Sequence, residues 1–302
     1  MHPPPPLFLA SIGNPPPRWH LTLHSAGHIL LNALARKLRA PLTAPGYDNN
    51  NTPPRSHPGP FVARTRLPES LAPLTLWQSP SLMNVSGPGV VRAYEKWCRE
   101  NGVDNKKGGR GTGVGAAGFD GLVRGVGGVE TGRGKGVIDE DGNVKPLLLK
   151  KTETTTTTPA DEANTKPIPL NLILLHDDLE LSPGKLSVRR GNATLSARGH
   201  NGIKSVVDSL VKAGLLASPR GGKRAGTAAV GMGAGGDDVI DPAHFQLTRI
   251  GVGIGRPASR EAAVVAEYVL GRMPERQVEV TEELVGDLVE VLEKEVKGMM
   301  VT

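Results

Sequence analysis

The apolar run in the segment PIPLNLILLHDDLEL most limits how this chain can fold. Leu170 and the four consecutive residues 172–175 are all aliphatic. A half-exposed strand alternates apolar and polar residues, so a short run of this kind is typical of a strand buried inside a sheet. Because strands of this type are covered by helices, the run favours an α/β fold.

Predicted strands and helices alternate along most of the chain. The other predicted strands lie within residues 7–13, 61–67, 74–78, 182–191 and 245–257. The predicted helices lie within residues 22–38, 81–100, 200–214, 259–273 and 281–299, the last two closing the chain. This alternation predicts a layered α/β architecture for a domain that extends over residues 1–302.

Two low-complexity stretches interrupt this pattern. Residues 101–166 contain a threonine run and, between 101 and 145, 15 of the 39 glycines. Such a sequence cannot bury enough apolar surface to offset the entropy of ordering, so we expect a disordered Gly/Thr-rich insertion there. We expect a second disordered insertion, rich in glycine, at residues 217–240.

Composition narrows the partners and the compartment. The net charge of +6 and the pI of about 9.5 favour a polyanionic partner. Cys98 is the single cysteine, which excludes an intrachain disulfide and a cysteine-rich metal site. No apolar run approaches the roughly 18 residues that span a membrane, and we expect no secretory signal. Because the first 47 residues lack Asp and Glu, as transit peptides do, we expect a cytoplasmic or mitochondrial protein.

Two local patterns suggest chemistry that their context does not support. The stretch GVGAAG at 113–118 matches the dinucleotide-binding glycine pattern and would indicate a nucleotide-dependent oxidoreductase. That pattern requires a preceding strand and a following helix, whereas this one lies within the Gly-rich stretch. His20, His24 and His28 are spaced by four residues, but the glutamate of zinc proteases is missing between them, so we expect no metal.

Several short pieces place Asn, His or Asp in turns shaped by Gly or Pro. They are IGNP (12–15), TLHSAG (22–27), LMNVSG (82–87), HDDLELSPGK (176–185) and GHNG (199–202). Each adjoins a predicted strand or helix end, where α/β folds gather their ligand sites. A single asparagine in such a turn usually caps the local backbone, so only the whole set indicates a site.

In this order, the pieces resemble the bacterial-type peptidyl-tRNA hydrolase family. GIGRP and YVLG near the end of the chain add to the resemblance, which covers residues 7–39, 61–100, 168–214 and 244–298. The resemblance implies a single α/β domain with a twisted mixed β-sheet flanked by helices. It also implies cleavage of the ester between a peptide and the 3′ ribose of transfer RNA, without a metal or a cofactor, by a monomer.

The resemblance assigns roles to individual residues. His24 matches the catalytic histidine, and Asp177 matches the aspartate that orients it. The matches to substrate-binding positions are Asn14, Trp19 (a tyrosine in most of the family), Met83, Asn84 and Asn201. The matches to phosphate-binding positions are Arg189 and, less strictly, Arg249, with Lys185, Arg190, Arg198 and Lys204 adding positive charge nearby.

The residue types suit ester hydrolysis. An imidazole with an ordinary pKa near 6.5 can take a proton from water at neutral pH. A carboxylate on its other nitrogen selects the tautomer and stabilises the imidazolium. Asparagine amides can donate hydrogen bonds to an oxyanion and to peptide carbonyls without titrating.

The chain also departs from the family pattern. The usual T-R-H-N reads TLHS, so Leu23 replaces arginine and Ser25 replaces asparagine. Strict alignment places Gly251 where a second phosphate-binding arginine is expected, with Arg249 two residues earlier on the same strand face. The loop GNATLSARG is longer and poorer in glycine than usual. These departures leave a non-catalytic RNA-binding module of the same fold as the alternative function.

Overall fold

The structure is a computed structural model that describes residues 3–15, 19, 21–43, 60–103, 137–138, 144–145, 168–218 and 244–301. The chain divides into two units, residues 1–112 with 166–302 and residues 113–165. Of the second unit, the structure describes two short antiparallel strands, β4 (Val137–Ile138) and β5 (Val144–Lys145). The GVGAAG pattern and most of both predicted insertions lie outside the described residues.

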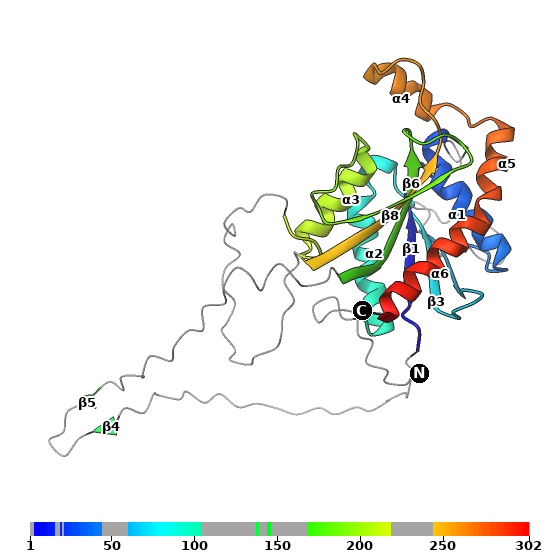
Figure 1. Cartoon of the computed structure of the whole chain (residues 1–302). Coiled ribbons are helices and arrows are strands. Elements are labelled where there is room, and N and C mark those ends of the chain that lie inside the picture. Colours follow the sequence, from blue (N-terminus) through cyan, green and yellow to red (C-terminus); the bar gives the residue numbers. More distant parts are fainter. Residues whose placement is uncertain are drawn as a thin grey trace, which may run out of the picture. The chain divides into compact units, whose positions relative to one another are not determined.

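A six-stranded mixed sheet runs through the larger unit (Figure 1). Its order is β2-β3-β1-β6-β8-β7. The strands are β1 (Leu7–Ser11), β2 (Phe61–Arg66), β3 (Pro73–Gln78), β6 (Ile168–Asp178), β7 (Leu186–Gly191) and β8 (Phe245–Gly253). The four central strands are parallel and the two edge strands are antiparallel to their neighbours, which confirms the predicted α/β fold with a mixed sheet.

The apolar run that predicted a buried strand lies in β6, between β1 and β8. Leu172 and Leu174 pack into the core on one face of the sheet, and Ile173 and Leu175 pack into the core on the other. Because both faces are covered, no position in this run tolerates a polar side chain cheaply. β6 therefore holds its C-terminal residues, which include Asp177, in a fixed place where the parallel strands end.

Helices cover both faces of the sheet (Figure 1). The first face is covered by α1 (Ala26–Lys37), α5 (Glu275–Glu283) and α6 (Val285–Val301), and the second by α2 (Gly87–Asn101) and α3 (Asn201–Lys212). The helix α4 (Ala262–Leu270) lies beyond the ends of β6 and β8. Two 3-10 turns, η1 (Leu23–Ser25) and η2 (Met83–Val85), precede α1 and α2. Among the described residues, none of the helices has both the length and the apolar character needed to cross a membrane.

The end of the chain forms three helices where the sequence predicts two. The additional helix, α5, starts after Pro274, whose ring fixes its own φ at −58°, and is separated from α6 by Leu284. Its sequence ERQVEVTEE contains few apolar residues. Apolar periodicity therefore cannot indicate this helix, which is stabilised mainly by its contacts with α1.

A close backbone contact sets the position of α1 on the sheet. A Cβ atom added at Gly27 would lie 2.9 Å from the carbonyl oxygen of Leu175 and 3.2 Å from its carbonyl carbon. Only glycine permits this approach, because backbone atoms of a central strand cannot move aside. As a result, α1 begins directly beside the end of β6.

Replacing Gly27 with alanine should therefore destabilise the protein. We expect a loss of about 1–3 kcal/mol in the free energy of unfolding, measured by urea denaturation. Gly298→Ala in α6 is the matched control, because a Cβ there meets no atom within 4 Å and should leave stability unchanged or raise it by about 0.5–1 kcal/mol. Equal stability of the two variants would contradict the tight packing of α1 on β6.

Candidate active site

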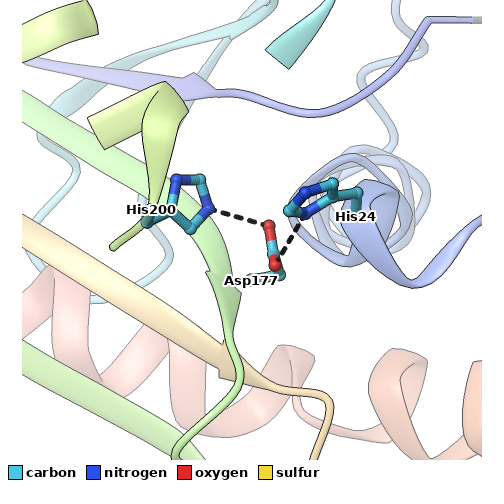
Figure 2. A group of neighbouring side chains, drawn as sticks. All are labelled: His24, Asp177 and His200. Atoms are coloured by element: carbon cyan, nitrogen blue, oxygen red, sulfur yellow. Dashed lines mark hydrogen bonds and ion pairs between the residues drawn. The ribbon is translucent and has the colours of Figure 1, made fainter. Parts of the chain in front are cut away.

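The centre of the site is the carboxylate of Asp177, which is 1% exposed. Its Oδ2 lies 2.9 Å from Nδ1 of His24, and its Oδ1 lies 3.0 Å from Nε2 of His200. Figure 2 shows the carboxylate between the two rings. His24 belongs to η1, directly before α1, and His200 directly precedes α3. The fold thus brings together the predicted pair, which is 153 residues apart in sequence.

The hydrogen bonds of His200 determine its tautomer. The backbone N–H of Ile203 donates to Nδ1 of His200 at 3.2 Å, which caps the N-terminus of α3. Because Nδ1 accepts this bond, it carries no proton, and the proton of the neutral ring lies on Nε2. His200 therefore donates its Nε2–H to Asp177 while its other nitrogen holds α3.

In His24 the proton lies on the other ring nitrogen. Its Nδ1 faces a carboxylate oxygen and therefore carries the donated proton, so Nε2 keeps its lone pair. The side chain is 23% exposed, so water can reach the ring. Burial disfavours the charged form of His24, but the charge and the hydrogen bond of Asp177 outweigh this effect and raise the pKa of His24 above its ordinary 6.5.

The same contacts keep Asp177 ionised. Burial alone would raise the pKa of Asp177, because it penalises the charged carboxylate. The interactions with His200 and His24 outweigh burial and hold the pKa of Asp177 well below its ordinary 3.8. The carboxylate is therefore a permanent acceptor at physiological pH.

Asp177 and the two histidines could also be considered as a metal site. One ligand atom from each of the three lies within 4.8 Å of the other two. However, the ring nitrogens that face Asp177 both carry protons that they donate to it. A metal ion would displace these protons and make His200 give up the cap of α3. The hydrogen-bond pattern therefore favours proton transfer over metal binding.

A cleft of about 730 Å³ adjoins this centre. All nine predicted site residues line it: Asn14, Trp19, His24, Met83, Asn84, Asp177, Arg189, Asn201 and Arg249. Residues of α4, including Val265 and Leu270, add apolar side chains to the lining of the cleft. The cleft thus offers an apolar surface, amide groups and positive charge beside a basic nitrogen.

The turn that carries Asn14 is fixed from two sides. The Oδ1 atom of Asn14 accepts the backbone N–H of Met83 at 3.2 Å, which turns its amide NH₂ away from that bond. Ser25 replaces the family's asparagine and is fully buried. Its Oγ lies 2.7 Å from the carbonyl oxygen of Trp19 and 3.0 Å from that of Asn14, so its one O–H group links the His24 turn to the Asn14 turn.

The remaining predicted residues differ in their exposure and in their hydrogen-bond partners. Asn84 and Asn201 are exposed in the cleft, and the side chain of Asn201 contacts Nζ of Lys204 at 3.5 Å. Between described residues, no hydrogen bond or ion pair involves the guanidinium of Arg189. Arg249 is 2% exposed, and its Nη2 donates to two loop carbonyls. Arg249 is thus occupied with the loop rather than directed into the open cleft.

Sequence reasoning misses the role of His200. The motif GHNG contains it, but its role depends on how close the fold brings it to Asp177. Its position at the start of a predicted helix is the one available indication, because a residue there can cap the helix. Arg190, which the sequence grouped with the cleft, instead pairs with the buried Glu295.

Comparison with known proteins agrees with the motifs. A peptidyl-tRNA hydrolase of Geobacillus kaustophilus is 30% identical over 128 residues, covering 42% of this chain and 49% of that protein. One from Moorella thermoacetica is 34% identical over 104 residues, covering 34% and 48%. The chain thus spans about half of the length of these curated relatives. No family model matches the chain.

A solved structure shares the fold. The crystal structure of peptidyl-tRNA hydrolase from Acinetobacter baumannii aligns with a TM-score of 0.50 and 17% identity, covering 99% of this chain and 93% of that one. The relatives and the shared fold support the bacterial-type peptidyl-tRNA hydrolase family as the one to which this chain is related.

Two further histidines beside the site make the stability depend on pH. Burial lowers the pKa of His28 to about 3 and, together with His200, lowers that of His176 to about 4. In the unfolded chain both rings titrate near 6.5. The unfolded chain therefore takes up protons below pH 6.5 that the folded protein does not, so acid favours unfolding.

We expect the free energy of unfolding to fall by a few kcal/mol as the pH drops from about 6.5 to about 4. Urea denaturation at a series of pH values measures this slope. His28→Gln should make the slope shallower, even if its stability at pH 8 is lower. An unchanged slope in this variant would contradict a neutral, buried His28.

Proposed function

We propose that this chain hydrolyses the ester bond between the peptide and the ribose of peptidyl-tRNA, with His24 as the general base. The observation that carries this proposal is the 2.9 Å contact between His24 and the buried Asp177 at a cleft lined by amides and arginines. An ester is reactive enough for attack by water once a base removes a proton from that water.

The first step uses the free nitrogen of His24. Nε2 takes a proton from a water molecule as its oxygen attacks the ester carbonyl, and a tetrahedral oxyanion forms. Asp177 stays ionised and stabilises the imidazolium through its bond to Nδ1. In the second step the carbon–oxygen bond to the ribose breaks, and Nε2 returns the proton to the leaving hydroxyl. The products are a free peptide and a transfer RNA.

The asparagines and Met83 position the reacting groups in this proposal. The Oδ1 atom of Asn14 is held by the N–H of Met83, so its amide NH₂ is the end left to donate to the substrate. Asn84 and Asn201, which both line the cleft, can donate to the oxyanion or to peptide carbonyls. Trp19 adds an aromatic surface at the same cleft.

The charge of the cleft suits the nucleic-acid part of the substrate. In this proposal Arg189 contacts a phosphate, and Arg249 supports the cleft by holding the carbonyls of Leu195 and Ser196 in the neighbouring loop. Positive charge of this kind attracts the transfer RNA through its backbone. The alternative function, an RNA-binding module without catalysis, predicts the same binding but no ester cleavage.

Replacing His24 with alanine should abolish turnover and spare binding of transfer RNA. We expect the rate to fall by at least about 10²–10⁴-fold, because the variant lacks the base. Cleavage of an N-blocked aminoacyl-tRNA measures turnover, and fluorescence anisotropy with deacylated transfer RNA measures binding.

His244→Ala is the matched control for this experiment. His244 precedes β8 at the end opposite to the site and should be dispensable for turnover. Near-normal turnover by His24→Ala would refute the assignment of the base. Binding without cleavage by the unaltered protein would favour the RNA-binding module instead.

Replacing Asp177 with asparagine should shift the titration of His24 to lower pH. The carboxylate is what raises the pKa of His24, and burial, which lowers it, remains in the variant. NMR titration of the histidine side chains measures this shift independently of activity. Turnover should fall by up to about 10⁴-fold, because the imidazole loses its orienting partner. An unshifted His24 titration would contradict the pairing.

A further inference from the structure

One wall of the cleft brings three arginines together. Arg189 on β7 lies directly opposite Arg249 on β8 in the strand register, and Arg198 lies in the loop before α3. Burial, followed by the charges of Arg189 and Arg198, lowers the pKa of Arg249 to about 10. Like charges placed opposite each other on a sheet repel, so this wall is unfavourable without a partner of negative charge.

The negative charge beside this wall is too small to balance it. Among the described residues, Asp178 is the one acid paired with these arginines, at 3.8 Å from Nη1 of Arg198. Asp178 is shared, because it also accepts from the hydroxyl of Ser187 at 3.1 Å and from the backbone of Glu180 at 3.0 Å. The Nη1 of Arg249 is buried without a hydrogen-bond partner in the same set of residues. Within the described part of the chain, the wall therefore has more positive charge than nearby acids balance, and it has an N–H group without an acceptor.

Neither position 249 nor position 251 of β8 can present a free cation to the cleft. Arg249 uses its Nη2 to hold the carbonyls of Leu195 and Ser196 at 3.2 and 3.3 Å. Gly251 has no room for any side chain, because a Cβ there would lie 2.6 Å from Oγ of Ser187 and 2.9 Å from Cβ of Asp178. A second cation beside Arg189 must therefore come from another element.

Arg198 meets this requirement. Its side chain is 44% exposed, and an ion pair of 3.8 Å at that exposure is weak, so Asp178 can release it at little cost. The loop that presents it is held by Arg249 and by the bond from the N–H of Arg198 to Oγ of Ser196 at 3.1 Å. Arg198 is thus a weakly held guanidinium on a loop that Arg249 fixes.

We propose that Arg198 is a phosphate-binding residue that, together with Arg189, contacts the backbone of the transfer RNA. The loop before α3 thereby supplies the cation that β8 does not present. This inference rests on the proposed function for the identity of the polyanion. The unbalanced charge of the wall calls for an anion, and a phosphate diester is an anion that two guanidiniums bind well.

The test is the salt dependence of transfer RNA binding by Arg198→Asn. Asparagine is chosen because Arg198 has a φ of 48°, a left-handed conformation that asparagine tolerates. With deacylated transfer RNA at about 0.1 M salt, we expect affinity to fall by about tenfold, as for loss of a charged hydrogen bond. The slope of log K against log salt should decrease by about one.

The matched control is Arg39→Asn. Arg39 is also an exposed arginine with a left-handed φ, of 53°, but it follows the C-terminal end of α1, whereas the site lies at the N-terminal end of that helix. Its affinity should change by less than about twofold. Arg198→Lys, which keeps the charge, should keep the salt slope of the unaltered protein and guards against a folding defect in Arg198→Asn.

The outcomes separate this inference from the proposed function. If the unaltered protein binds transfer RNA and Arg198→Asn binds it with the same affinity and salt slope, the role of Arg198 is wrong, whatever the turnover. A loss of affinity equal to that of Arg39→Asn would overturn it as well. If the protein binds but does not cleave, and Arg198→Asn alone weakens binding, the phosphate contact stands and the hydrolase proposal fails.

Discussion

The cleft depends on one buried charge. A carboxylate that water cannot reach is stable only where hydrogen-bond donors replace the water, and Asp177 accepts from an imidazole on each oxygen. The two imidazoles come from opposite faces of the sheet, because His24 precedes α1 and His200 precedes α3. One carboxylate therefore fixes the end of β6 and the starts of two helices, and the cleft is the space beside that junction.

Asp178, the residue after Asp177, carries a second carboxylate with different partners. Successive side chains of a strand point to opposite faces, so Asp177 faces the imidazoles while Asp178 faces Ser187 and the arginine wall. This alternation gives the two neighbouring carboxylates different partners within one cleft. The arginines consequently do not compete with His24 for the carboxylate of Asp177, because Arg198 pairs with Asp178.

Some of this arrangement could be predicted from the sequence because it depends on local patterns. The aliphatic run before Asp177 predicts a buried strand, and the order of the Asn, His and Asp turns predicts which residues gather at its end. The role of His200 depends on a contact across 23 residues, and no periodicity encodes such a distance. The attachment of Arg249 to loop carbonyls depends on the path of that loop, and the polar sequence of α5 lacks the apolar stripe by which helices are recognised.

At two positions where the chain departs from the family pattern, neighbouring side chains explain how the departure is accommodated. Ser25 is shorter than asparagine, yet its buried hydroxyl still reaches the carbonyls of Trp19 and Asn14, so the turn keeps its links with a smaller side chain. At the wall, the side chain of Asp178 occupies the space that a residue at position 251 would need, and the same side chain lies 3.8 Å from Arg198. Ser187 and Asp178 together therefore leave no room for a cation at position 251 of β8, and the carboxylate of Asp178 attracts a cation from the loop instead. The place of one side chain thus bears both on the missing cation of β8 and on the arginine that the loop presents.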